Sequence, residues 1–183
     1  MTRTPLLFAL VLSLALTGCA AHRTSAGAAR RIPDYYASAA GFSARVRAAV
    51  DRGTSENTFT LLWKQDGQGT SIEVVSPSSV AGLRAEIAPD SRTLVYDGAV
   101  LTLPEAVSPL ELLPVLGLAW ESPWSEYETA KDTVTLISYE TVAGEPCELR
   151  TRFDAVTLLP LEAAVFLDGR RVVLYSFELF SFS

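Results

Sequence analysis

The stretch LRTRFDAVTLLPLEAAVFLDGRRVVLYSFELF, residues 149–180, decides which fold this sequence can adopt. Apolar and polar side chains alternate along most of it, which is typical of a strand with one face on a core and the other in water. Asp168-Gly169 separates two such runs, and an Asp-Gly pair in that place favours a two-residue hairpin turn. The stretch therefore predicts consecutive antiparallel strands.

The same period of two begins at Phe42 and dominates the rest of the chain. The clearest alternating runs cover residues 42–51, 58–64, 71–74, 83–87, 94–96, 100–103 and 133–137. Asp97-Gly98 supplies a second hairpin signal. Turn signals recur every 8–15 residues or so, which leaves little room for crossover helices, so we expect about ten strands in an antiparallel, strongly curved sheet. The predicted fold class is mainly β (α+β).

Residues 108–118 break this pattern. Ser108 as a helix N-cap, Pro109 at the first helical position and Glu111 closing a capping box predict the start of a helix. Pro114 lacks an N–H group, so the helix should be short, kinked or split. Because the segment is apolar on almost every side, we expect it to cover apolar surface as a short helical lid.

An acidic stretch with two tryptophans follows this segment. Trp120 and Trp124 lie among Glu121, Glu126 and Glu128, in what we expect to be an irregular loop. The tryptophans either form a flap at the mouth of the sheet or cap its end. The carboxylates lack the apolar surroundings that would raise a pKa, which favours a solvated loop over an active site.

The N-terminal residues predict export and lipidation. Leu16-Thr17-Gly18-Cys19 has the form of a lipobox, and the apolar run before it is too short to span a bilayer as a helix. We expect residues 1–18 to be a lipoprotein signal peptide and Cys19 to become the acylated N-terminus. The alternative is an ordinary secretory signal with a chance cysteine.

The remainder divides into a tether and one domain. Residues 19–41 are predicted to be a lipidated tether and lead-in, flexible from Ala20 to about Ala29 because the residues are small and polar, with one or two helical turns over residues 30–41. Residues 42–183 are predicted to form the β domain.

Composition disfavours several classes of function. The chain has 21 acidic and 15 basic side chains and no basic cluster larger than a pair such as Arg30-Arg31, which argues against nucleic-acid binding. His22 is the one histidine, so neither a histidine metal cluster nor a Ser-His-Asp triad can be assembled. With Cys19 acylated, no disulfide partner remains for Cys147, which we expect to be a small buried hydrophobe. Phosphate-binding glycine loops and nucleophile elbows are missing, so the sequence supports no enzyme, metal or cofactor.

Three stretches in this order resemble the LolA/LolB superfamily of lipoprotein carriers and the related lipoproteins of monoderm bacteria. They are VSPSSVAGLRAEIAPDSRTLVYDGAVLTL at residues 75–103, SPLELLPVLGL at 108–118, and the closing stretch, in which Asp154-x-x-Thr157-x-x-Pro160 precedes a strand with an Asp-Gly turn. The resemblance covers residues 42–182. It implies a LolA-like open half-barrel with a helical lid over a hydrophobic cavity that accepts acyl chains.

Members of that family differ in role, which leaves two functional hypotheses. Soluble carriers shuttle lipoproteins, lipid-anchored acceptors insert them into an outer membrane, and some monoderm lipoproteins serve in spore germination. The first hypothesis is an extracytoplasmic, lipid-anchored envelope protein that binds acyl chains of a lipid or lipoprotein. The second is an anchored scaffold for a protein partner or a homodimer, for example in germination, with its cavity packed shut. The anchor would lie in the cell membrane of a monoderm, or in the inner or outer membrane of a diderm.

The candidate ligand site is the apolar face of the sheet together with the lid. We expect its lining to comprise Phe59, Leu61, Trp63, Ile72, Val74, Leu94 and Tyr96 on the strands, and Leu116 and Leu118 on the lid. An acyl chain would bind there because its surface is removed from water. For each of these residues, ordinary core packing is the alternative.

Overall fold

The computed structural model describes residues 27–88, 90–102, 124, 126–142 and 145–182, which form one sheet and a helix over residues 27–37. In chain order the strands are β1 (Phe42–Asp51), β2 (Glu56–Asp66), β3 (Gly69–Ser76), β4 (Arg84–Ala88), β5 (Ser91–Tyr96), β6 (Ala99–Thr102), β7 (Glu126–Ala130), β8 (Thr133–Val142), β9 (Glu145–Asp154), β10 (Pro160–Leu167) and β11 (Arg170–Phe182). The predicted lid at 108–118, with Leu116 and Leu118, lies outside the described residues, as do Trp120, Glu121 and the segment 1–26.

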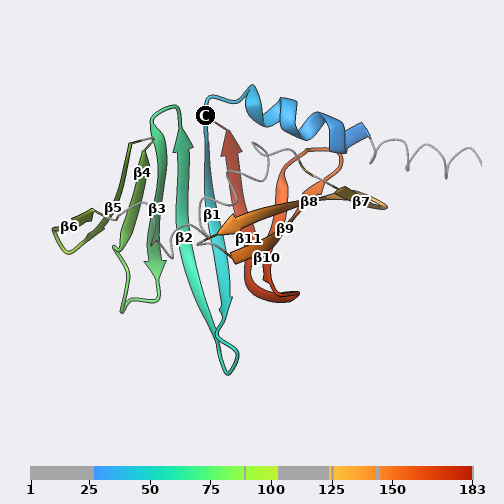
Figure 1. Cartoon of the computed structure of the whole chain (residues 1–183). Helices are drawn as coiled ribbons and strands as arrows, with labels where there is room; N and C mark the ends of the chain where they lie inside the picture. Colours follow the sequence, from blue (N-terminus) through green and yellow to red (C-terminus); the bar gives the residue numbers. More distant parts are fainter. Residues whose placement is uncertain (1–26, 89, 103–123, 125, 143–144, 183) are drawn as a thin grey trace, which may run out of the picture.

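All strand pairs are antiparallel, as the alternation and turn spacing predicted. The order across the sheet is β6-β5-β4-β3-β2-β1-β11-β10-β9-β8-β7, so two meanders meet where β1 pairs with β11 (Figure 1). The chain leaves the sheet at one edge, β6, and re-enters it at the other, β7. The two edges are therefore consecutive in the sequence.

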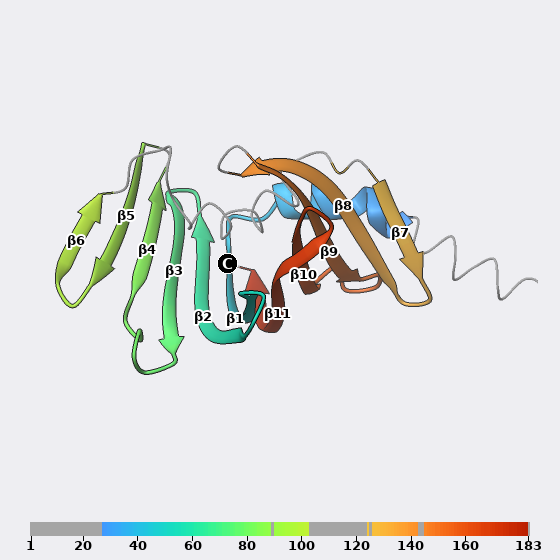
Figure 2. The ribbon, with the colours of Figure 1, turned by 60° about the horizontal axis from the view of Figure 1, so that its bottom comes forward.

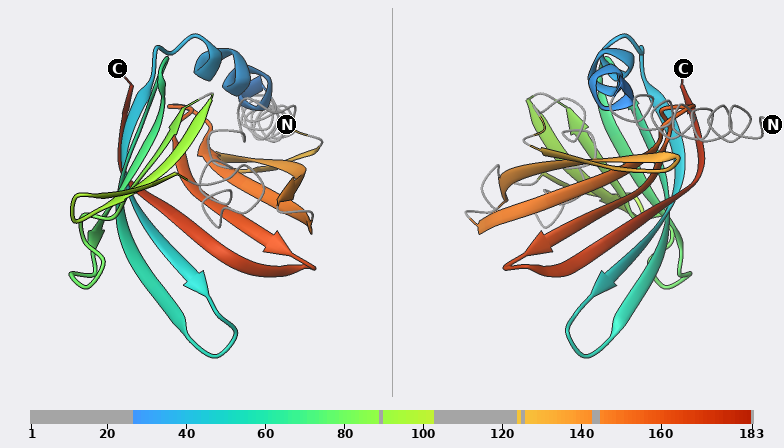
Figure 3. Two further views of the ribbon diagram at one scale, coloured as in Figure 1. Left: turned by 60° about the vertical axis from the view of Figure 1, so that its left-hand side comes forward. Right: turned by 90° about the vertical axis from the view of Figure 1, so that its right-hand side faces the viewer.

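The sheet curves into an open half-barrel, which confirms the predicted fold class (Figures 2 and 3). Register shifts interrupt several of the strand pairs, among them the shift beside Arg45 and Val46 in the pairing of β1 with β11 and that beside Val165 and Phe166 in the pairing of β10 with β11. Bulges of this kind increase local twist and bend a strand. Such bends allow a sheet of eleven strands to curve around the side chains of its inner face.

The inner face of the sheet, defined as the face that carries the buried side chains, holds the hydrophobic core. On β1, the alternation predicted from Phe42 onward is confirmed, because Phe42, Ala44, Val46 and Ala48 are at most 6% exposed. On β11, the bulge changes the spacing of inward side chains from two residues to three. Its inward-facing members are therefore Val173, Tyr175, Phe177, Phe180 and Phe182.

The helix over residues 27–37 packs at the rim of the half-barrel, beside the β7–β9 end of the sheet (Figures 1 and 3). Ala28, Ala29 and Ile32 have no exposed surface, and Tyr36 is 6% exposed. The spacing of positions 28, 32 and 36 places these three side chains on one helical stripe. The prediction of a flexible segment is wrong for residues 27–29, since small alanines allow the helix backbone to lie close against the sheet.

Both predicted Asp-Gly hairpins are confirmed. Asp97 and Gly98 have φ of 48° and 78°, and Asp168 and Gly169 have φ of 49° and 73°. Two successive positive φ values define the turn that matches the twist of paired strands, and Asp and Gly tolerate them. The turns therefore set the register of β5 against β6 and of β10 against β11.

Candidate functional site

The candidate site lies on the inner face of β2–β6. Strand register aligns five inward side chains in one line across these strands, and we call this line the inner row. Its members, from the centre of the sheet to its edge, are Trp63, Ile72, Ala85, Leu94 and Leu101. Every member is apolar, so the inner row is a continuous line of hydrophobic side chains from the core to the edge strand β6.

Exposure rises along the inner row. Trp63, Ile72 and Ala85 are 0%, 2% and 3% exposed, whereas Leu94 is half-buried and Leu101 is 58% exposed. The inner end is thus packed core and the outer end is accessible surface. The accessible part of the candidate site consequently lies on β5 and β6.

The predicted lining residues divide accordingly. Leu61 is 4% exposed and belongs with Trp63 and Ile72 in the packed core. Phe59 and Val74 are partly buried and pack against that core, while Tyr96 on β5 is 45% exposed. Only part of the predicted set therefore presents surface that a ligand can contact.

Leu101 was missed from the predicted set, although a signal for it existed. The two-residue turn at Asp97-Gly98 pairs Tyr96 with Ala99 and Leu94 with Leu101. Counting outward from that turn would have placed Leu101 on the same face as Leu94. Arg92 is the one charged residue of β1–β6 that the register places on the inner face, two positions before Leu94.

On the other half of the sheet the helix packs at the rim, and a short loop fixes the helix there. The Tyr36 hydroxyl donates a hydrogen bond to the Leu158 carbonyl oxygen at 3.0 Å, and both residues are buried. Leu158 has a φ of 60° in the loop that begins at Asp154. One carboxylate oxygen of Asp154 accepts hydrogen bonds from the backbone N–H groups of Thr157 and Val156 and from the Thr157 hydroxyl. These bonds, above all that from the Thr157 N–H, lower the pKa of Asp154.

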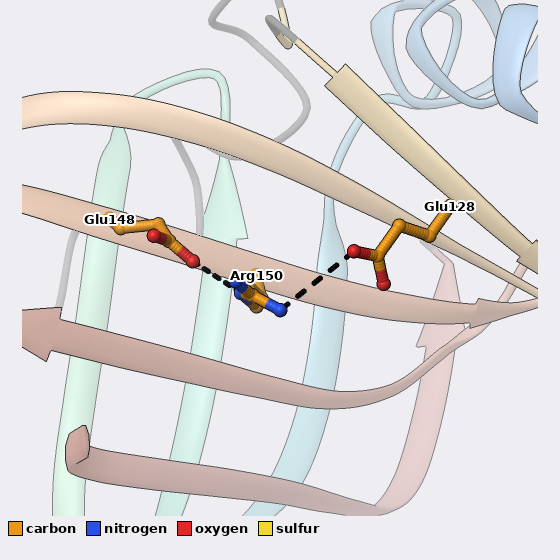
Figure 4. Close-up of polar contacts among 3 residues, drawn as sticks. All are labelled: Glu128, Glu148 and Arg150. Carbon is orange, nitrogen blue, oxygen red and sulfur yellow. Dashed lines mark hydrogen bonds and ion pairs between the residues drawn. The ribbon is translucent and has the colours of Figure 1, made fainter. Parts of the chain in front are cut away.

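The outer face carries the ion pairs of the described residues. Arg150 on β9 lies between Glu148 and Glu128, as Figure 4 shows, and its guanidinium stands 5.3 Å from the ring centre of Phe166. The hydrogen bond that Arg150 donates to Glu148 is the main reason that the pKa of Arg150 is raised. Arg152 pairs with Glu162 at 2.6 Å on the same face. Of these pairs, Arg150–Glu128 and Arg152–Glu162 join different strands, and Arg150–Glu148 lies within β9.

The predicted acidic loop is wrong where it can be checked. Glu126 and Glu128 lie on β7, and the register of β7 with β8 places both on the outer face, where Glu128 contacts Arg150 at 3.9 Å. Trp124 is partly buried against the core and meets Tyr127 edge to face at 5.2 Å. This position fits the capping interpretation of Trp124.

Little reactive chemistry is arranged in the described residues. Cys147 is 3% exposed, as expected for a small buried hydrophobe. Burial raises the pKa of Tyr36 and Tyr175, which keeps both hydroxyls neutral. In the parts of the chain that the structure describes, no three His, Cys, Asp or Glu side chains gather in a way that could hold a metal ion.

Among those same residues, no helix has the length and apolar character that crossing a membrane requires.

No protein-family model and no curated protein matches the sequence. Among solved structures, an uncharacterized conserved protein from Thermus thermophilus has a TM-score of 0.54 at 11% identity, over 85% of this chain and 87% of that chain. A LolA superfamily protein from Nitrosomonas europaea has a TM-score of 0.44 at 8% identity, over 80% and 87% of the two chains. A structure of the CwlD amidase from Clostridioides difficile in complex with the GerS lipoprotein has a TM-score of 0.46 at 14% identity, over 82% and 87%.

At these identities the likeness concerns the fold alone. The chain shares its overall fold with the Thermus thermophilus protein.

Proposed function

We propose that this chain is an extracytoplasmic envelope lipoprotein, acylated at Cys19, that binds acyl chains of a lipid or lipoprotein at the outer end of the inner row. Export and acylation rest on the lipobox sequence at residues 16–19. The ligand class rests on the accessible apolar surface of Leu94, Tyr96 and Leu101, and on the LolA-like character of the fold.

The single observation that carries the proposal is the exposure of apolar side chains on the inner, concave side of the sheet. Leu101 and Tyr96 are 58% and 45% exposed on the face that elsewhere forms the core. Apolar surface contributes about 25 cal/mol per Å² when it is removed from water, so an acyl chain laid along β5 and β6 gains affinity without any catalytic group.

Two adjacent residues on β5 provide a matched test. Leu94 and Val95 are both half-buried, but the register places Leu94 on the inner face and Val95 on the outer face. A carboxylate on the inner face would have to be desolvated by a bound acyl chain, so Leu94→Glu should weaken binding of a fluorescent fatty acid at least about tenfold. Val95→Glu should leave binding within about twofold, because its carboxylate stays in water.

Native mass spectrometry of the purified protein supplies the second readout. Copurifying fatty acid or phospholipid, reduced in Leu94→Glu and retained in Val95→Glu, would support the proposal. The absence of bound lipid from the wild type and both variants, or equal lipid binding by Leu94→Glu and Val95→Glu, would overturn the proposal. An empty protein that forms a stable homodimer or partner complex would instead favour the anchored scaffold.

Acylation is tested separately. Metabolic labelling with an alkyne fatty acid should modify the wild-type chain and not Cys19→Ser. Label on Cys19→Ser, or none on the wild type, would contradict the anchor while leaving the ligand proposal to its own test.

A further inference from the structure

A pocket of about 500 Å³ lies at the rim of the half-barrel, away from the outer end of the inner row. It is formed where the end of the helix, the start of β1, the β2–β3 turn and the end of β11 meet, in the upper part of Figure 1. The segment after the helix contributes Ala39, Ala40 and Gly41. These residues have almost no side chain, which leaves the space open.

The charges that line this pocket are all negative. Asp34 enters from the helix and Asp66 from the end of β2, and no Lys, Arg or His is among the described residues that line the pocket. Neither carboxylate takes part in an ion pair with another described residue, although Asp66 accepts a hydrogen bond from the Gln68 N–H at 2.8 Å. The helix ends beside the pocket, and the carbonyl end of a helix carries partial negative charge. The potential in the pocket therefore favours a cation.

Aromatic side chains complete the lining. Tyr36, Phe42 and Phe182 contribute to the wall, and the rings of Tyr36 and Phe182 lie 5.2 Å apart. Phe182 is half-buried and offers more accessible ring surface than Tyr36 and Phe42, which are 6% and 5% exposed. Aromatic rings attract organic cations through their quadrupole and also accept alkyl groups. A small, strongly hydrated metal ion prefers a shell of oxygen ligands instead, and an anion would be repelled.

We propose that this pocket binds an organic ammonium group. The ammonium would lie near Asp34 and Asp66, and its alkyl substituents would contact the aromatic wall. A free alkylamine and the headgroup of an ammonium phospholipid share this chemistry. The site is independent of the acyl-chain proposal, because it uses different residues at a different part of the sheet.

The test is an NMR titration of the full chain with hexyltrimethylammonium, using hexanoate as the comparator of equal alkyl length. Hexyltrimethylammonium should shift the amide signals of residues 34–42 and 65–67, and hexanoate should not. Asp34→Lys places a tethered cation at the rim on an exposed helical position, so it should weaken binding at least about fivefold at low salt. Asp66→Asn keeps the oxygen that accepts the Gln68 N–H and removes only the charge, so it should weaken binding about threefold.

Asp168→Asn is the matched control. Asp168 is an exposed hairpin residue outside the pocket lining, and Asn also adopts its positive φ. This variant should bind like the wild type. Equal shifts by hexanoate, or unchanged affinity in both Asp34→Lys and Asp66→Asn, would overturn the proposal.

The two sources of the group are separated with vesicles. Flotation of the Cys19→Ser protein, which lacks the proposed anchor, with phosphatidylcholine vesicles but not with phosphatidylglycerol vesicles, and its loss when Asp34→Lys is added, would identify a lipid headgroup. Binding of hexyltrimethylammonium without such flotation would identify a soluble amine. Either result supports an ammonium site.

Discussion

Replacing Tyr36 with Phe should loosen the helix from the sheet by a predictable amount. The substitution keeps the ring and its contacts with Phe153 and Phe182, and removes only the hydroxyl that donates to the Leu158 carbonyl at 3.0 Å. Leu158 is 2% exposed, so water cannot readily replace the lost donor. A buried carbonyl without a partner costs about 1–3 kcal/mol, and we expect Tyr36→Phe to lower the free energy of unfolding by about 1–2 kcal/mol.

Urea denaturation followed by circular dichroism measures this loss, and a thermal melt should show a decrease of about 2–8 °C for a domain of this size. Tyr35→Phe is the control on the same helix, because Tyr35 is 41% exposed and no described residue bonds to its hydroxyl. It should change stability by less than about 0.5 kcal/mol. Equal losses in the two variants, or no loss in Tyr36→Phe, would refute the reasoning.

A double-mutant cycle then tests whether the Asp154 loop positions the acceptor. Asp154→Ala removes the carboxylate that holds the Val156 and Thr157 N–H groups at 3.0 and 2.7 Å, and so releases the turn in which Leu158 has its positive φ. Combined with Tyr36→Phe, the loss should be smaller than the sum of the single losses by at least about 0.5 kcal/mol. Strict additivity would show that the loop does not hold the carbonyl for the helix.

Three further outcomes follow from single sites. Gly69→Ala should lower the free energy of unfolding by about 2–4 kcal/mol in urea denaturation, since Gly69 has a φ of 149° and a Cβ there would lie 2.3 Å from the Ile87 carbonyl oxygen. Gly67→Ala is the control, because a Cβ at Gly67 meets open space, and it should lower the free energy of unfolding by less than about 1 kcal/mol. Thr151→Val should stabilise the protein by about 1 kcal/mol, because the fully buried Thr151 hydroxyl has no partner among the described residues, and a destabilised variant would disprove this. Because the pKa of Asp154 is lowered in the folded protein, its carboxylate stabilises the fold above the ordinary carboxyl pKa of about 4, and this stabilisation is lost as the pH falls through the pKa of the folded protein. The difference in free energy of unfolding between wild type and Asp154→Asn should therefore narrow on acidification. A difference that does not depend on pH would contradict this.

The strands were predictable because their signals are local. The alternation from Phe42 to Val50 matches the inward and outward positions of β1, and the Asp-Gly pairs mark the two hairpins with successive positive φ values. Each signal needs only neighbouring residues. For that reason the antiparallel, curved sheet could be inferred without knowing which distant strands pair.

The helix and β7 were harder to predict because their stability comes from distant contacts. Ala28 and Ala29 carry no apolar pattern of their own, and they are buried only because the sheet lies beside them. Glu128 was expected in a solvated loop, whereas its contact with Arg150 depends on the register of β7, β8 and β9. Pairing between strands is a tertiary property that no short window of sequence contains.

For the candidate site, the sequence predicts the face on which a side chain lies but not its exposure, because exposure also depends on distant strands. A period of two tells which face a side chain occupies, so Trp63 and Leu94 were correctly placed together on the inner face. It does not tell how far a strand lies from the edge of the sheet, and that distance decides exposure. Trp63 lies one strand from the central β1 and is fully buried, whereas Leu101, on the edge strand β6 and in the same row, is 58% exposed. An edge position with an apolar inner face is therefore the feature that separates accessible apolar surface from buried core in this sheet, and it becomes visible only when hairpin registers are counted outward from the centre of the sheet.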